Sequence, residues 1–583
     1  MTENIKMLVL ELLDRLDQHI SAQLLLLHHN GNNSGSSYFG GAGEPTGFTG
    51  LHGVAFFGIV EMISTVLAMK EWDFNAYDCT GMTALTWAAA GGHEEVVKTL
   101  LQQEGINPDR AYSKWGSTPL LRAAAKGHAG VVKSLLERKD VDPDRADSNY
   151  GQTPLSWAAK NGNEGVVKML LEREDANPDW ADNRASRTPL WLSAERGHEG
   201  VVKMLLERGD VNPDRADTVY GHTPLSWASK KGHGGVVKLL LERKDVNPNR
   251  AVGQWGSTPL SCAAQGGHER VVKMLLQQED VNPDQADARY GQTPLSWAAK
   301  HGREGVVKML LERKDVNPNW EDTRASRTPL LLSVKRGHEG VVKMLLERGD
   351  VNPDLADTEY GRTPLSWAAE NGHEGLVKMF LEREDVDPDQ VDPICGRVPL
   401  SWAAWYGYEG TVKMLLQREG VGPDRTDTTF GRTPLSWAAG NGYLGVVRIL
   451  LHREGVNPNR PDTKFGRTPL SWATKNGHEG VVRILFERDD VNPDLADTRS
   501  GRTPLSWAAE NGNEGVVGTL LELKGVNPNR TDTRFGLTPS SWAAQSGHEG
   551  IVKMLLERED VKPVFATGQS VRPEGRTRTD YES

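Results

Sequence analysis

Cysteine is scarce in this sequence of 583 residues. The three present, Cys79, Cys262 and Cys395, lie far apart and have neither the pairing of a disulfide framework nor the spacing of a metal site. This scarcity favours a reducing compartment. No apolar run reaches the roughly 18 residues of a membrane span, and the N-terminus lacks the basic flank and apolar core of a signal peptide. We therefore expect no membrane association and a cytoplasmic location, with the nucleus as an alternative.

Positive charge is also in short supply. The sequence has 68 Lys and Arg against 79 Asp and Glu, which gives a net charge of −11 at pH 7. A nucleic-acid-binding protein is expected to show a basic excess, so we expect no nucleic-acid partner. The phosphate-binding pattern G-x-x-x-x-G-K-[ST] does not occur, and Gly40-Gly41-Ala42-Gly43 follows no strand. No cofactor is expected.

The sequence instead has one unit in many copies. The segment from Tyr360 to Asp392, YGRTPLSWAAENGHEGLVKMFLEREDVDPDQVD, is typical of them. Its Thr-Pro pair recurs every 35 residues from Thr118 to Thr538, with Thr83-Ala84 and Val398-Pro399 in the other two places. So strict a spacing predicts stacked copies of one small structural unit rather than a fold with a single centre.

Each unit predicts two short helices and a loop. Thr153 can cap a helix through its hydroxyl group, Pro154 suits the first helical position, and Gly162 can end the helix in a left-handed turn. The apolar stripe in residues 166–171 predicts a second helix, which Pro178 ends. One such pair is too small to bury its own apolar face, so neighbouring pairs must stack. The sequence thus predicts an all-α repeat solenoid.

The repeated pattern is similar to a known family. Thr-Pro-Leu-x-x-Ala-Ala-x-x-Gly-His, then Val-Val-Lys-x-Leu-Leu and Val-Asn-Pro-Asp, resembles the ankyrin repeat over roughly nine-tenths of the chain. The resemblance implies a helix–turn–helix with a β-hairpin-like loop, about 15 repeats counting a worn first unit at Thr49, and non-catalytic binding of other proteins. The unit departs from the family in its length of 35 rather than about 33 residues. Ser156 stands where the family has His, and Trp often replaces Leu.

Three regions are predicted. Residues 1–47 hold an amphipathic helix and a flexible Gly/Ser/Asn-rich linker, residues 48–561 the solenoid, and residues 562–583 a disordered tail. The first 80 or so residues also resemble the junction ahead of the ankyrin array in fungal NACHT-type signalling proteins. That resemblance implies an alternative function, the ligand-sensing arm of a nucleotide-switch system whose ATPase domain is absent from this chain. We expect a monomer.

A longer period lies within the array. Arg184-Ala-Ser-Arg returns as Arg324-Ala-Ser-Arg, and Trp115-Gly-Ser-Thr returns as Trp255-Gly-Ser-Thr. Both offsets are 140 residues (324 − 184 and 255 − 115), or four units of 35. A block near 115–254 was therefore duplicated into 255–394.

Candidate binding residues lie at or near the two variable positions between Ala-Ala and Gly. In the ankyrin fold this pair ends the first helix and faces the concave groove that binds partners. Basic residues there are Lys230, Lys231, Lys300, His301, Lys335 and Arg336, and the aromatic residues are Trp405, Tyr406, Tyr408 and Tyr443. The basic set has the plainer interpretation of a solvated face. The aromatic set is the first candidate for a partner site, because Tyr and Trp are enriched at binding hot spots.

Three further columns have structural interpretations. The Gly-His-Glu-Gly tetrads, such as His198-Glu199, occur once per repeat without H-E-x-x-H, so we expect a structural cap at the inter-helix turn rather than a metal or acid/base site. The Trp column, such as Trp157, is expected to pack inside rather than form a ligand ladder. The Arg column before the Thr, such as Arg362, is expected to stabilise the loops by stacking and by pairing with Asp. We predict no catalytic residues and no metal site.

Overall fold

The computed structural model describes residues 48–69, 72–78, 80–112 and 115–561. The predicted N-terminal helix and linker (1–47) and the predicted tail (562–583) lie outside the described residues. Two compact units follow the chain order. The first runs to Ala298 and includes Arg303–Asn317, and the second comprises Ala299–Gly302 and continues from Pro318.

The described residues form 30 helices in fifteen pairs and no strand. In the first unit they are α3 (Gly50–Phe57), α4 (Val60–Met69), α5 (Ala84–Gly91), α6 (Glu94–Leu101), α7 (Pro119–Lys126), α8 (Ala129–Leu136), α9 (Pro154–Asn161), α10 (Glu164–Leu171), α11 (Pro189–Arg196), α12 (Glu199–Leu206), α13 (Pro224–Lys231), α14 (Gly234–Leu241), α15 (Pro259–Gly266), α16 (Glu269–Leu276) and α18 (Glu304–Leu311). Helix α17 (Pro294–Lys300) ends at the division between the units.

The second unit continues the same alternation. Its helices are α19 (Pro329–Val334), α20 (Glu339–Leu346), α21 (Pro364–Asn371), α22 (Glu374–Leu381), α23 (Pro399–Tyr406), α24 (Glu409–Gln417), α25 (Pro434–Asn441), α26 (Leu444–Leu451), α27 (Pro469–Asn476), α28 (Glu479–Leu485), α29 (Pro504–Glu510), α30 (Glu514–Glu522), α31 (Pro539–Ser546) and α32 (Glu549–Leu556).

The local signals of the sequence act as predicted. The Thr153 hydroxyl accepts a hydrogen bond from the Ser156 amide at 3.2 Å, and Pro154 opens α9. Gly162 ends the helix with φ of 74°, a left-handed conformation that glycine adopts without strain. The same Thr cap recurs in most odd-numbered helices of both units. Val398 has no hydroxyl and makes no such bond at α23.

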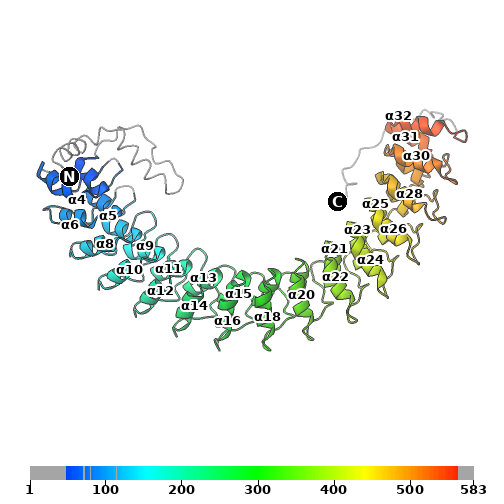
Figure 1. Ribbon diagram of the computed structural model, residues 1–583. Helices are drawn as coiled ribbons and strands as arrows, with labels where there is room; N and C mark the ends of the chain where they lie inside the picture. The colour runs from blue at the N-terminus through cyan, green and yellow to red at the C-terminus, as the bar shows by residue number, and fades with distance from the viewer. Residues whose placement is uncertain (1–47, 70–71, 79, 113–114, 562–583) are drawn as a thin grey trace. The chain divides into compact units, whose positions relative to one another are not determined.

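The hydrophobic core forms where the helices of neighbouring repeats pack against one another. Helix α9 packs against α7 and α11, and α10 packs against α8 and α12. Leu155, Ala158 and Ala159 of α9 are fully buried, as are Val167 and Leu170 of α10. The small alanines let neighbouring helices approach closely, and Figure 1 shows successive pairs side by side within each unit. The repeat solenoid and the count of about 15 repeats are therefore confirmed.

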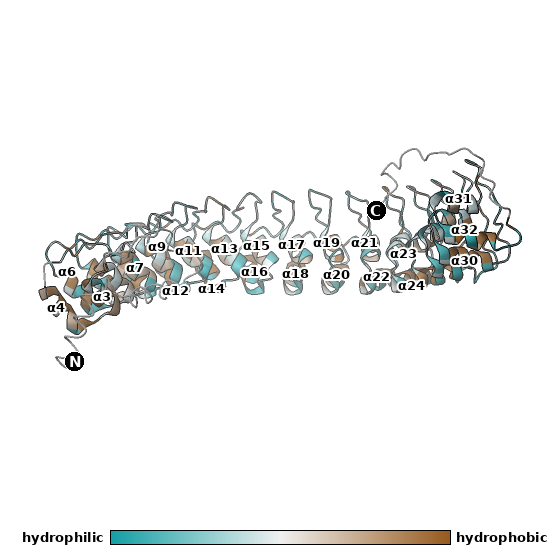
Figure 2. Ribbon diagram, turned by 90° about the horizontal axis from the view of Figure 1, so that it is seen from above, coloured by the Kyte–Doolittle hydropathy of each residue, from teal (hydrophilic) through white to brown (hydrophobic). Residues whose placement is uncertain are grey.

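A buried aspartate organises each hairpin-like loop. In the loop before α9, Asp147 Oδ1 accepts the Tyr150 amide at 2.6 Å, and Oδ2 accepts the Gln152 amide at 3.2 Å and the Trp157 indole Nε1–H at 2.9 Å. The Trp column is thus not only packed, as predicted, but also hydrogen-bonded to the loop. Figure 2 shows these loops projecting from the helices.

The histidine of each tetrad has a structural role, but not as a side-chain cap. His198 occupies the N-cap position of α12, yet its side chain makes no hydrogen bond to that helix. Its Nε2–H donates instead to the Lys160 carbonyl of the preceding repeat at 3.1 Å. The histidine therefore joins neighbouring repeats, and the predicted cap is replaced by an inter-repeat hydrogen bond.

A second aspartate column contains carboxyl groups with raised pKa values, as Asp144 illustrates. Asp144 accepts the Asn177 amide at 2.8 Å, and burial raises the pKa of its carboxyl group from 3.8 to about 6. Because the folded pKa lies above the unfolded value, this group's contribution to stability is complete below about pH 4 and is lost as pH rises through 6. The same position is Asn249 three repeats later, and its Oδ1 accepts the equivalent Asn282 amide.

Asp144→Asn is therefore expected to raise the free energy of unfolding by about 1 kcal/mol at pH 7 and to change it little at pH 4. The gain is smaller than ideal linkage gives because the side chain is only partly buried. Urea denaturation at the two pH values measures it. An equal gain at both would show that ionisation of Asp144 is not the cause.

Candidate functional site

In several repeats, the first variable position at the end of the odd-numbered helix contacts an arginine of its own repeat. Arg362 forms an ion pair with Glu370, eight residues on, and Arg502 forms the equivalent pair with Glu510. In the repeat that follows Arg362, Arg397 is 3.7 Å from the Trp405 ring centroid. When the residue at the first variable position changes from Glu to Trp, the arginine of the same repeat therefore still contacts it. In these repeats the second variable position is the one exposed to solvent.

The Arg column also connects repeats. In the second unit, five guanidinium groups of this column each lie over the indole of their own repeat and over that of the next. The distances to the next ring centroid are 3.8 Å for Arg362–Trp402, 4.8 Å for Arg397–Trp437, 3.3 Å for Arg432–Trp472, 4.2 Å for Arg467–Trp507 and 3.5 Å for Arg502–Trp542. The predicted stacking is confirmed. The ion-pair partners of Arg362 and Arg502 are glutamates rather than the Asp that we expected.

These guanidinium groups are buried. Burial lowers the pKa of Arg397 and of Arg467, and the carboxylates of Asp427 and Asp497 act in the opposite direction. The Arg–Trp column is therefore part of the packing of the second unit.

The predicted aromatic set lies together on α23 and the turns that follow α23 and α25. Trp405 stacks on Trp437 with ring centroids 4.2 Å apart and an angle of 13°. Tyr406 stacks on Trp405 at 6.3 Å and on Tyr408 at 6.2 Å. Trp405 is half-buried in these contacts, whereas Tyr406 is 43% exposed. Of the two residues, Tyr406 has more surface to offer a partner.

Tyr408 and Tyr443 take the place of the tetrad histidine. A Cβ on Gly372 would lie 2.6 Å from the Tyr408 ring, and one on Gly407 would lie 2.6 Å from the Tyr443 ring. Both tyrosines therefore pack on the turn of the preceding repeat, as the histidines do. Leu444, which we did not predict, stands where most repeats have Glu and is 46% exposed. The departure from Gly-His-Glu-Gly to Gly-Tyr-Leu-Gly was the signal for it.

The predicted basic set is divided between the two units. Lys230 and Lys231 end α13 in the first unit, and their amines lie 4.8 and 5.6 Å from the Trp227 ring centroid. The other four belong to the second unit: Lys300, His301, Lys335 and Arg336. Lys335 Nζ lies 4.0 Å from the Trp367 centroid, while Arg336 and Lys231 are exposed. Lys230 and Lys335 thus stand on aromatic faces of their own chain.

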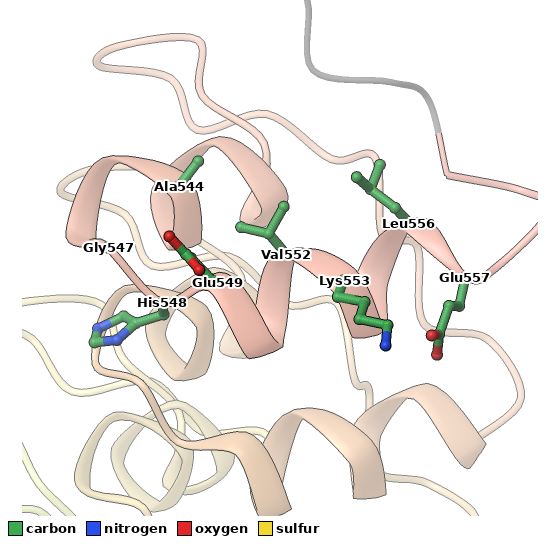
Figure 3. Close-up of a pocket in the computed structure, with 8 residues that line it drawn as sticks. All are labelled: Ala544, Gly547, His548, Glu549, Val552, Lys553, Leu556 and Glu557. Carbon is green, nitrogen blue, oxygen red and sulfur yellow. The ribbon is translucent and has the colours of Figure 1, made fainter.

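A hollow of about 600 Å³ lies on the last described repeat. Figure 3 shows its lining, with Ala544 from α31 and with Val552 and Leu556 along α32. In most other repeats the corresponding face is covered by the next helix pair of the same unit. The hollow is thus the uncovered end of the described stack, and we assign no ligand to it.

The described residues contain no group of three or more His, Cys, Asp or Glu that could hold a metal ion. Among the same residues, no helix has the length and apolar character that crossing a membrane requires. Cys262 is buried, and burial raises the pKa of its thiol to about 12, so it is unsuited to nucleophilic chemistry.

Comparison with known families gives one match. The family model for ankyrin repeats, which describes three copies, matches residues 17–112, 104–182, 174–252, 244–322, 315–392, 400–497 and 490–564. No curated protein matches the chain significantly.

Proposed function

The chain belongs to the ankyrin-repeat family, and on that premise we propose that it binds another protein through a surface formed by Trp405, Tyr406, Tyr408, Tyr443 and Leu444. Ankyrin repeats are generally protein–protein interaction modules. In this proposal the chain is a non-catalytic, monomeric cytoplasmic scaffold whose binding module is the solenoid of residues 48–561.

The exposed ring of Tyr406 carries the proposal. The same position is Asn371 in the preceding repeat and Asn441 in the following one, and both donate a side-chain hydrogen bond to a main-chain carbonyl. Asparagine at this position is therefore compatible with the fold. A tyrosine that stays 43% exposed beside a stacked tryptophan instead provides the rigid, amphipathic surface found at interface hot spots.

The basic residues are expected to contribute less to partner binding than the aromatic residues. The exposed side chains of Lys231 in the first unit and Arg336 in the second would speed encounter with an acidic partner and would be sensitive to salt. Lys230, Lys300, His301 and Lys335 are half-buried and are expected to contribute less.

The test replaces the aromatic pair by the residues of the preceding repeat. Alanine at Trp405 would remove the ring that stacks on Trp437 and so disturb packing. The double variant Trp405→Glu/Tyr406→Asn instead allows Arg397 an ion pair of the kind that Arg362 makes with Glu370. We expect it to fold like the parent and to bind the partner more than about tenfold more weakly.

The measurement is affinity capture with quantitative mass spectrometry, followed by titration of the purified partner. The matched control is Glu370→Trp/Asn371→Tyr, which places an aromatic pair one repeat away and should not restore binding to the double variant. Equal capture by the parent and the double variant would contradict the proposal. The captured protein that the double variant no longer binds could be an ATPase with a phosphate-binding loop. That result would favour the alternative function, the sensing arm of a NACHT-type system, over a general scaffold.

A further inference from the structure

The tips of the hairpin-like loops, which project from the helices in Figure 2, often carry an aromatic ring. In six repeats this ring meets the Trp-column residue of its own repeat edge to face. The ring centroids are 6.1 Å apart for Tyr150–Trp157 and 5.8 Å for Tyr360–Trp367. The same contact is made by Tyr290, Phe430, Phe465 and Phe535. An aromatic loop tip is therefore usually held by its own repeat.

Trp255, at a loop tip of the first unit, lacks this contact. Cys262 stands at the Trp-column position of its repeat, and Val252 replaces the loop aspartate. Main-chain hydrogen bonds between Val252 and Ser257, at 3.0 and 3.2 Å, close the loop instead. Among the described residues Trp255 contacts no other aromatic ring. Arg289 lies 5.3 Å from its ring centroid, and Trp255 is still 42% exposed.

Tyr220, at the tip of the preceding loop, lacks the contact for a different reason. The ring of His222 lies against the Trp-column residue Trp227, with centroids 4.8 Å apart. Within the described part of the chain, the Tyr220 ring contacts only that of His222, at 6.5 Å. Tyr220 is 61% exposed, and the adjacent Val219 is 57% exposed.

The two loops lie against each other. A Cβ on Gly221 would be 2.8 Å from the Gly253 amide nitrogen, so the main chains of the two tips touch. The exposed apolar side chains of both tips therefore form one surface, which we call the loop-tip patch. It consists of Val219, Tyr220 and Trp255.

Positive charge flanks the loop-tip patch. Arg184 lies one loop before it and Arg289 one loop after it, and both are exposed. Each guanidinium stacks on a tip ring, 4.2 Å from the Tyr150 centroid for Arg184 and 5.3 Å from the Trp255 centroid for Arg289. Neither forms an ion pair with a carboxylate of the described residues. The chain has a net charge of −11, yet Asp and Glu are absent from the five tips of this region: 148–150, 183–185, 218–220, 253–255 and 288–290.

We propose that the loop-tip patch binds an extended acidic segment of a partner protein. Apolar side chains of the segment lie against the patch, and its carboxylates pair with Arg184 and Arg289. A stacked guanidinium still presents its N–H edge to a carboxylate, and exposed Tyr and Trp are typical interface anchors. The inference rests on the proposed role in partner binding and adds a second contact, in the first unit, with a specified chemistry.

The spacing of the loops sets the length of the segment. Arg184 and Arg289 are three repeats apart. Packed helices lie about 10 Å apart and an extended chain advances about 3.3 Å per residue, so this distance corresponds to about nine residues. The segment should therefore have acidic residues at both ends and apolar residues in the middle.

The test uses the full chain labelled with 5-fluorotryptophan, in which the Trp255 signal is identified by its loss in Trp255→Phe. Fluorine NMR titrations compare the probe acetyl-EEGSLLFSGEE-amide with its neutral counterpart, acetyl-QQGSLLFSGQQ-amide. We expect the acidic probe to shift the Trp255 signal and to bind about fivefold more tightly than the neutral probe. Equal affinity for the two probes would overturn the proposal. Tighter binding of an oligothymidylate than of the acidic probe would assign the patch to single-stranded nucleic acid instead.

Two double variants separate the apolar and the charged contributions, with affinity measured by fluorescence anisotropy of the labelled probes. Tyr220→Ala/Trp255→Ala introduces the residue that Ala185 shows to be compatible with the fold, and should weaken binding of the acidic probe at least about tenfold. Arg184→Gln/Arg289→Gln should remove the preference for the acidic probe and leave the affinity for the neutral probe unchanged. Full affinity in the first variant, or a retained preference in the second, would refute the inference.

The matched control is Tyr360→Ala, which removes a tip ring that packs on Trp367 in the second unit. It should leave the affinity for the acidic probe unchanged. A weaker affinity would mean that the probe recognises loop-tip rings in general, against the assignment to the loop-tip patch. None of these variants changes Trp405 or Tyr406, so failure here would leave the result of the capture experiment unaffected.

Discussion

Asp462→Ala is expected to lower the free energy of unfolding of the second unit's repeats by about 4 kcal/mol. Asp462 is buried before α27, and its carboxylate accepts hydrogen bonds from the Phe465 amide (2.6 Å), the Arg467 amide (3.2 Å) and the Trp472 indole N–H (2.9 Å). Alanine leaves these three donors without the carboxylate. Each unsatisfied buried donor costs about 1–3 kcal/mol, and partial access of water to the loop reduces the sum.

The matched control is Asp490→Ala in the following loop. Asp490 makes a bidentate pair with Arg488 at 2.6 and 2.9 Å but is exposed, so its loss should cost less than about 1 kcal/mol. Denaturant unfolding followed by tryptophan fluorescence measures both variants. If the two lost the same stability, the loop aspartate would be no more than another surface carboxylate.

The main features of the fold could be predicted from the sequence because each depends on neighbouring residues. The Thr153 cap, the first-turn Pro154 and the left-handed Gly162 act within ten residues, and their recurrence every 35 residues fixes the stacking. The side-chain pairings between a loop and the helix that follows it could not be obtained in this way, because they depend on how the loop folds back on the helix. The Trp157–Asp147 hydrogen bond spans ten residues and the Arg362–Glu370 pair spans eight, across a helix end.

The candidate site was predicted in position but not in burial. The ankyrin resemblance implied that Trp405 and Tyr406 end the first helix of their repeat, and they lie at the end of α23. It did not indicate that Trp405 stacks on Trp437 of the next repeat, because that contact depends on the pitch between repeats.

The internal copies make a different kind of inference possible. Where a residue departs from its own repeats, the other copies show what the fold needs at that position. Asn371 and Asn441 show that Tyr406 is not required for folding. A residue that differs from its equivalents and lies on the surface, such as Tyr406, is a candidate for binding. A residue that differs inside the stack can be used to test packing.

Phe380→Ala is the packing test with the largest expected effect. Phe380 is a fully buried residue of α22, at a position that is Leu170 in α10. Helix α22 packs against α21, α20 and α24, so the cavity would open where three helices meet. We expect a loss of about 4 kcal/mol, from the lost transfer free energy together with the cavity.

The matched control, Phe380→Leu, restores the residue of the other repeats and should cost no more than about 1.5 kcal/mol, since the surrounding side chains can close on it. Each repeat contacts only its neighbours, so a weakened interior repeat should also divide unfolding into two transitions. Calorimetry and urea denaturation measure both effects. A single sharp transition with an unchanged midpoint in the alanine variant would mean that the repeats around α22 do not depend on this side chain, and that the core is held by the alanine-rich helices alone.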